Sequence, residues 1–206
     1  MSKSEQTKAH IMRAAILLFT ERGFEGSTLR DIANAAELNM GLIRYHFGSK
    51  ADLYRDTLAH VAEPYNRACL SALQEAQEAN APLEGLLYAW LAAPYTHWDE
   101  AELVTGEELL CFLNKMGYES AELTHDVYES HYSYALQAWE SALLAQLPAS
   151  LSRGDWLWCL TCLRGMYFNI VAHNEFTLWG LPAIHGKEPA LERLASDAAA
   201  MLRAKH

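Results

Sequence analysis

Residues 28–50 read TLRDIANAAELNMGLIRYHFGSK and decide the fold of the N-terminal part of the chain. Apolar residues recur there at helical spacing and define one inward-facing stripe: Leu29, Ile32, Ala33 and Ala36. Thr28 precedes the stripe as an N-cap, and Asp31 stands three residues later in the position of a capping-box acid. The segment is therefore expected to begin with a short, well-capped amphipathic helix.

A second short helix is expected after a tight turn. Glu37 and Leu38 form the turn, and Asn39 is a suitable N-cap for the helix that follows. Ile43 and Phe47 lie four positions apart and form its inward-facing pair. The other side chains of this helix then point outward, where they could enter the major groove of DNA.

The outward side of this segment supplies the candidate DNA contacts. Arg44 and Tyr45 are expected to contact bases, whereas Thr28, Arg30 and Lys50 are expected to hold phosphates. A glycine near the start of the second helix lets a phosphate approach the free backbone N–H groups. The predicted set is Thr28, Arg30, Asn39, Met40, Gly41, Arg44, Tyr45, His46 and Lys50. By pattern alone, two capped helices joined by a tight turn could equally belong to a small helical domain that does not bind DNA.

The segment from about His10 to Leu58 resembles the N-terminal domain of TetR-family transcriptional repressors. The resemblance rests on TLRDIANAA and NMGLIRYHFGSKADLY, which match in inward positions, caps and the HFGSK segment. It implies a helix-turn-helix head, a homodimer, a palindromic double-stranded DNA operator and a helical body that responds to a small-molecule effector. The family usually has Gly where Glu37 stands, so either a left-handed residue there carries about 1–2 kcal/mol of strain or the turn differs locally. It commonly has Tyr in place of Arg44, which alters the base contact expected there.

Charge and composition separate the chain into two parts. The chain has 206 residues, 51% of them apolar, so it can bury a substantial core. The net charge is −10, but residues 1–60 carry eight basic and seven acidic residues, and the excess of acid lies beyond them. A nearly neutral N-terminal head with an acidic body suits DNA contact by the head.

The sequence indicates neither secretion nor a membrane span. The N-terminus has no apolar run of the secretory type. The densest apolar stretch, residues 156–172, is short for a span and contains Arg164 and Asn169. We therefore expect a cytoplasmic protein.

The predicted fold class is all-α. A three-helix head at residues 1–50 precedes a helical effector-binding and dimerisation bundle at residues 51–206, and a linking helix continues to about residue 79. Pro64 is expected to kink that helix near Glu63. Body helices are expected at residues 83–98, 101–116, 121–147, 155–173 and 189–204.

The last two of these helices are candidates for a dimer interface. The helix at residues 155–173 is apolar almost all round and must be buried on two sides. The final helix adds a stripe formed by Leu191, Leu194, Ala195, Ala198 and Leu202. Together they predict a four-helix interface between two subunits, as the TetR resemblance also implies. The alternative is a monomer whose own helices cover both faces.

The aromatic content of the body suggests a largely apolar effector site. Most of these side chains are expected in the core, but a surplus of Trp, Tyr, Met and His could line a pocket. The candidate residues are Trp90, Trp98, Phe112, Met116, Tyr128, Tyr132, Arg164 and Tyr167. Arg164, placed among apolar neighbours, is expected to pair with an acid across the dimer or with an anionic effector. Residues 147–165 also faintly resemble the fatty-acid-responsive PsrA-type branch, without assigning an effector.

The favoured function is a homodimeric, sequence-specific transcriptional repressor that a small molecule releases from DNA. An activator or an effector-independent DNA-binding protein is the alternative. An enzyme is less well supported, because the His residues lack a metal-binding spacing and no phosphate-binding glycine loop is present. Cys159 and Cys162 form C-x-x-C on an apolar helix, where small core residues are more consistent than a metal site. We expect no cofactor and no metal.

Overall fold

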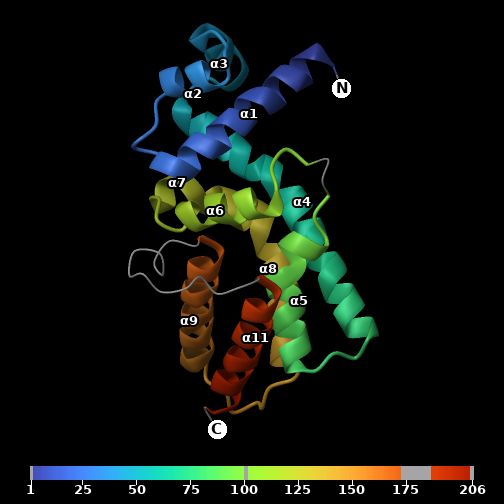
Figure 1. The fold of residues 1–206 in the computed structure, drawn as a ribbon. Helices are drawn as coiled ribbons and strands as arrows, with labels where there is room; N and C mark the ends of the chain where they lie inside the picture. Colours follow the sequence, from blue (N-terminus) through green and yellow to red (C-terminus); the bar gives the residue numbers. More distant parts are fainter. Residues whose placement is uncertain (1, 100–101, 173–186, 205–206) are drawn as a thin grey trace, which may run out of the picture. The chain divides into compact units, whose positions relative to one another are not determined.

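The computed structural model of the chain describes residues 2–99, 102–172 and 187–204, and these ranges contain helices and no strands (Figure 1). The helices are α1 (Lys3–Arg22), α2 (Leu29–Ala35), α3 (Met40–Phe47), α4 (Lys50–Glu78), α5 (Leu83–Thr96), α6 (Gly106–Met116), α7 (Ala121–Val127), the π-helical turn η1 (Tyr128–Tyr132), α8 (Ser133–Leu144), α9 (Arg153–Ala172) and α11 (Lys187–Arg203). The all-α prediction is confirmed. Within the same ranges, none of the helices combines the length and apolarity needed to cross a bilayer.

Two helices differ from their predicted extents. The helix expected at residues 121–147 is interrupted by η1. This turn buries Tyr132, whose hydroxyl donates to the Leu58 carbonyl oxygen at 2.8 Å. The helix expected from residue 101 begins at Gly106, because Thr105 and Glu108 form a capping box there. His173, predicted as the end of another helix, lies outside the described residues.

The helices form two compact units. Unit 1 comprises Met1–Tyr65 and Asp99–Ser133, and unit 2 comprises Asn66–Trp98 and Tyr134–His206. The α4 helix is continuous through Pro64 and passes from one unit into the other one residue later. This division differs from the predicted boundary at residue 50, because α6, α7 and η1 pack with the N-terminal helices. A functional boundary at residue 50 stays a prediction.

Unit 1 has an aromatic centre. The Tyr54 ring of α4 packs edge-on against Phe19 of α1, with 4.9 Å between ring centroids, and against Phe112 of α6 at 5.7 Å. Phe24, in the loop after α1, lies 5.4 Å from the same Tyr54 ring. Ile43, 0% exposed, buries the inner side of α3 in the same unit. The segment from Thr28 to Lys50 therefore belongs to the unit whose aromatic centre is formed by α1, α4 and α6.

Unit 2 consists mainly of apolar packing among α5, α8, α9 and α11. Trp139 and Trp156 are 0% and 1% exposed, and the Trp139 ring stacks on Trp90 with centroids 5.9 Å apart. The predicted stripe of α11 is buried within the chain, where α11 packs on α5 and α9. Its members are Leu191, Leu194, Ala195, Ala198 and Leu202. The prediction that this stripe closes a dimer is therefore wrong, because it is already covered by the chain's own helices.

Candidate nucleic-acid interface

The start of α2 is fixed by a complete capping box. Thr28 Oγ1 accepts from the Asp31 backbone N–H at 3.1 Å, and the Thr28 backbone N–H donates to Asp31 Oδ2 at 3.1 Å. The Thr28 hydroxyl also donates to this carboxylate at 2.5 Å, and this bond lowers the pKa of Asp31 below its ordinary value. The capping predicted from the sequence is confirmed.

The turn between α2 and α3 contains a left-handed residue, which is one of the two alternatives expected there. Glu37 has φ +52°. Its N–H donates to the Asn34 carbonyl at 3.1 Å, and the N–H of Leu38 donates to the Ala33 carbonyl at 2.9 Å. These two bonds form a Schellman motif, whose left-handed position usually holds glycine. The turn therefore keeps the family geometry while a non-glycine residue carries its strain.

The α3 helix has the predicted inner and outer sides. Ile43 and Phe47 are 0% and 6% exposed, whereas Tyr45 is 82% exposed. Met40, Gly41 and Arg44 are exposed as well, and His46 is half-buried beside the Tyr45 ring. Outward side chains of α3 are thus free to meet a partner surface.

The N-terminus of α3 has a cap that suits a glycine. Asn39 Oδ1 accepts from the Gly41 N–H at 2.7 Å. A Cβ on Gly41 would lie 3.1 Å from that same oxygen, which is tighter than ordinary contact. Glycine therefore permits the cap and keeps this end of the helix accessible.

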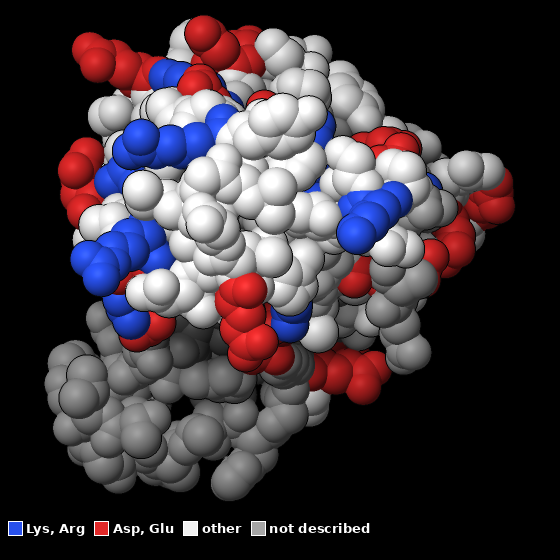
Figure 2. All heavy atoms as spheres, turned by 90° about the horizontal axis from the view of Figure 1, so that it is seen from above, with Lys and Arg blue, Asp and Glu red and all other residues white. Residues whose placement is uncertain are grey.

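Basic side chains are dispersed over the surface around α3 (Figure 2). Figure 2 looks onto the end of the molecule that carries α3 in Figure 1; Lys and Arg side chains lie among uncharged residues, with several Asp and Glu side chains towards the edge. Arg30 and Arg44 are exposed members of this segment. Dispersed cations of this kind suit several separate phosphate contacts.

Lys50 has a structural role that the sequence did not indicate. Its Nζ donates to the Phe24 carbonyl at 2.8 Å and to the Ser27 carbonyl at 3.0 Å. The ammonium also lies 4.0 Å from the centroid of the Phe24 ring. Lys50 therefore fixes the loop before α2, and its predicted contact with a phosphate is not tested by this geometry.

The predicted effector residues do not gather within one unit. Four of them belong to unit 1 (Phe112, Met116, Tyr128 and Tyr132) and four to unit 2 (Trp90, Trp98, Arg164 and Tyr167). The buried aromatic ones act as core residues with partners: Tyr167, for example, donates its hydroxyl to the Leu91 carbonyl at 2.8 Å. Within the chain the Arg164 side chain is exposed and lies over the Phe168 ring, 5.6 Å from the centroid, so its pairing with an acid across a dimer or with an effector stays a prediction.

A small apolar cavity lies inside unit 2. Its volume is about 10 Å³, which is room for about one water molecule. Leu87, Trp156, Leu163 and Ala198 are among its lining residues. Drug-sized ligands occupy pockets of about 300–1,000 Å³, so this cavity would have to expand to hold one.

The chemistry of a metal site is not assembled in the described ranges. No group of three or more His, Cys, Asp or Glu side chains in residues 2–99, 102–172 and 187–204 is placed to hold a metal ion. Cys159 is buried in unit 2 and lines the small cavity, and Cys162 is half-buried. Neither of these two cysteines forms a disulfide.

Comparison with known proteins identifies a family that the N-terminal segment matches. Residues 11–57 match the family described as bacterial regulatory proteins, tetR family. The HTH-type transcriptional repressor NicS of Pseudomonas putida is 33% identical over 66 residues, covering 32% of this chain and 31% of NicS. The match to YttP of Bacillus subtilis, a probable HTH-type transcriptional regulator, is 29% identical over 93 residues and covers 44% of this chain and 45% of YttP. The chain thus spans less than half the length of these relatives.

Solved structures extend the likeness to the whole chain. A TetR-like transcriptional regulator, LfrR of Mycobacterium smegmatis, has a TM-score of 0.59 at 16% identity, over 97% of this chain and 98% of LfrR. At this identity the likeness establishes the fold. The relatives above are named as transcriptional regulators, in agreement with the prediction that the chain is not an enzyme. The N-terminal segment of the chain thus matches the tetR family of bacterial regulatory proteins, and the fold of the chain is that of TetR-like regulators.

Proposed function

We propose that the chain is a sequence-specific DNA-binding transcriptional repressor. The observation that carries this proposal is α3, whose inner pair is buried in unit 1 while Arg44 and Tyr45 remain exposed. A short helix held rigidly from one side, with Arg and Tyr on the other, can enter the major groove and contact base edges. NicS is itself named as a repressor.

The proposed contacts divide into base reading and phosphate positioning. Arg44 and Tyr45 read bases, with Met40 and His46 beside them on α3. Phosphates meet the capped N-termini of the two helices and the basic side chains near them. These phosphate contacts come from Thr28, Arg30, Asn39 and Gly41. Lys50 holds the loop before α2, and the salt dependence of binding tests its predicted phosphate contact separately.

Selection of bound sequences from a random DNA pool tests this proposal. Arg44→Ala and Tyr45→Ala should each cost about 1–3 kcal/mol of binding to the selected operator and relax one position in it. Tyr118→Ala is the matched control, because Tyr118 is also in unit 1 and is 82% exposed, like Tyr45. Folded Arg44→Ala and Tyr45→Ala proteins that bind as the unchanged protein does would show the assignment to be wrong.

The proposed repressor acts as a homodimer through the outer side of α9. Leu157, Trp158 and Met166 are 49%, 60% and 37% exposed there. A Cβ added at Gly165 would meet no atom within 4 Å, so a second helix can approach closely. Because two-fold symmetry presents two copies of α3, the operator should be palindromic.

Sedimentation of a charged variant tests the dimer. Trp158→Glu should separate the subunits, because a carboxylate would be buried without a partner. Leu17→Glu, an equivalent change at an exposed residue of α1, should leave the dimer intact. A dimeric Trp158→Glu protein would exclude α9 as the interface. Ala198→Glu is unsuitable, because Ala198 is 4% exposed within the chain.

A small, largely apolar effector completes the proposal. The LfrR structure contains proflavine, and the small cavity of unit 2 is a place where an apolar ligand could expand the packing. A thermal-shift screen with hydrophobic acids, aromatics and cationic drugs would find binders, which are then titrated into the operator complex. Binders that stabilise the protein without loosening DNA would favour the alternative, an effector-independent regulator, which the small size of the cavity also favours.

A further inference from the structure

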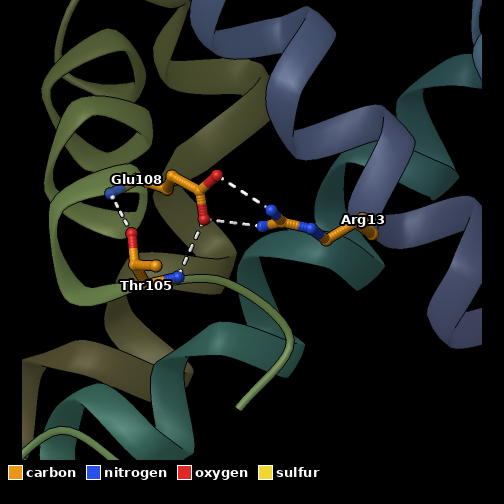
Figure 3. Close-up of polar contacts among 3 residues, drawn as sticks. All are labelled: Arg13, Thr105 and Glu108. Carbon is orange, nitrogen blue, oxygen red and sulfur yellow. Dashed lines mark hydrogen bonds and ion pairs between the residues drawn. The ribbon is translucent and has the colours of Figure 1, made fainter. Parts of the chain in front are cut away.

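Helix α6 is tied to α1 by two acidic side chains, one near each end of α6. Arg13 of α1 donates from Nη1 to Glu108 Oε2 at 2.6 Å and from Nη2 to Glu108 Oε1 at 2.9 Å (Figure 3). Glu119, just after α6, accepts the backbone N–H of Phe24 at 2.8 Å, just after α1. Both contacts join residues 95 positions apart in the chain, so α1 and α6 run in the same sense and in register.

Glu108 also caps the first turn of α6. The same carboxylate accepts the Thr105 backbone N–H at 2.8 Å, and Thr105 Oγ1 accepts the Glu108 N–H at 3.2 Å (Figure 3). The bond from Arg13 is the main reason that the pKa of Glu108 lies below its ordinary value. Because the capping box orients the carboxylate, the first turn of α6 determines where Arg13 is held.

The contact of Glu119 falls on the loop that leads into α2. This loop, residues 23–27, is also held by Lys50 through the Phe24 and Ser27 carbonyls. Ser27, 1% exposed, donates its hydroxyl to the Gly23 carbonyl at 2.9 Å. The loop ends at the α2 cap residue, so a shift of the loop would shift the start of α2.

We infer that α6 contributes to DNA binding. Glu108 and Glu119 are positioning residues: they fix the positions of α1 and of the loop before α2. Neither residue belongs to the matching segment 11–57 or lies on α2 or α3. The inference rests on the proposed DNA binding. Through these contacts, a change in the position of α6 alters the positions of α2 and α3 without a movement of α4.

Three substitutions in the full chain isolate these contacts. Glu108→Gln removes the ion pair but keeps a side chain that the capping box accepts. Glu119→Ala removes the acceptor for Phe24, whereas Glu119→Gln retains an acceptor oxygen. Glu122→Gln, at an exposed residue of α7, is the control for loss of one negative charge in unit 1.

Operator affinity, its salt dependence and amide exchange are the measurements. Glu108→Gln and Glu119→Ala should each weaken binding to the selected operator roughly three- to tenfold, as expected for loss of one partly exposed contact. The slope of affinity against salt concentration should not change, because no phosphate contact is lost. Amide exchange in residues 23–38 should become faster. Glu119→Gln and Glu122→Gln should behave like the unchanged protein.

Two outcomes would overturn the inference. One is wild-type operator affinity in folded Glu108→Gln and Glu119→Ala proteins, even if these melt at lower temperature. The other is unchanged amide exchange in residues 23–38. If the unchanged protein selects no DNA sequence, the proposed function fails, and the exchange measurement still decides whether α6 positions the loop.

Discussion

Both units combine aromatic packing with charged pairs between distant segments, such as Arg203 with Glu84 in unit 2, but the charged contacts of unit 1 hold the segments next to α2 and α3. In unit 1, charged side chains bind distant segments, as Arg13 does with Glu108 and Lys50 with the Phe24 carbonyl. In unit 2, large aromatic side chains fill the core and place their polar atoms on backbone carbonyls. Trp139 Nε1 donates to the Cys69 carbonyl at 3.1 Å in this way.

The difference corresponds to what each unit has to do. A hydrogen bond to a charged group is directional and fixes the orientation of the segments that it joins. Apolar burial is not directional and contributes mainly stability. Unit 1 is accordingly built to hold α2 and α3 in a defined orientation, and unit 2 to provide a stable core.

The largest effect on stability is expected in the core of unit 2. Trp139→Ala should lower the free energy of unfolding by about 3–5 kcal/mol, because it leaves a cavity beside the stacked Trp90. Arg13→Ala in unit 1 should cost about 1 kcal/mol or less, since that pair is partly exposed. Urea unfolding of both variants measures the contrast. Equal losses would show that the two units do not differ as described.

The sequence predicted the first three helices of unit 1 closely because their signals are local. Thr28 with Asp31, and Asn39 before α3, are caps that can be read within a few positions. The left-handed Glu37 was one of the two alternatives expected for the same reason. The partners of Lys50 and Arg13 were not predictable, because they lie 26 and 95 positions away and depend on tertiary packing.

Unit 2 was predicted less completely because periodicity identifies an apolar stripe but not what covers it. The stripe containing Ala198 was assigned to a second subunit and is covered by α5 and α9. Arg164 was expected to pair across a dimer or with an effector because its sequence neighbours are apolar, and within the chain its side chain is exposed. On a helix that is apolar nearly all round, the hydrophobic pattern does not distinguish the two sides.

A substitution of Lys50 can distinguish two roles in unit 1: orienting the loop before α2 and neutralising a DNA phosphate. Lys50→Met should reduce stability by about 1–3 kcal/mol, because two carbonyls lose a charged donor. Operator binding should weaken, but its salt slope should change by clearly less than one unit if the ammonium mainly holds the loop. Arg30→Gln is the comparison: as an exposed phosphate contact it should flatten the slope by about one unit. A full unit of flattening for Lys50→Met would instead make it a phosphate contact.

As the pH falls, unit 1 should unfold at a higher pH than unit 2. Hydrogen bonds within unit 1 lower the pKa of Asp31, Asp52 and Glu108 in the folded protein. A lowered folded pKa stabilises the fold fully above the ordinary carboxyl pKa of about 4, and this stabilisation is lost as pH falls through the lowered value. In unit 2, Glu84 has the same kind of shift through Arg203. Below about pH 4, unit 1 therefore loses more of this carboxylate stabilisation than unit 2 does.

Trp fluorescence reports on unit 2, whereas operator binding reports on unit 1, so the two units can be followed separately. The five Trp residues that the structure describes, at positions 90, 98, 139, 156 and 158, lie in unit 2, and Trp179 lies outside the described residues. Loss of helical circular dichroism and of operator binding should therefore precede the change in Trp fluorescence as pH falls. Glu108→Gln should move the first transition to higher pH and leave the second in place. A single coincident transition would contradict this order.

The smallest expected effect on stability concerns a type of turn that occurs in both units. Asn80 has φ +50° after α4, and it and Ala81 donate to the Gln77 and Ala76 carbonyls as in the Schellman motif after α2. Asn tolerates the left-handed conformation, whereas Glu37 carries strain there. Glu37→Gly should therefore stabilise the protein by about 0.5–1 kcal/mol, after the greater freedom of glycine in the unfolded chain is subtracted. Asn80→Gly should change stability by less than about 0.5 kcal/mol. Thermal unfolding of both variants at one pH measures the difference, and equal stabilisation at the two turns would show that Glu37 is not specially strained.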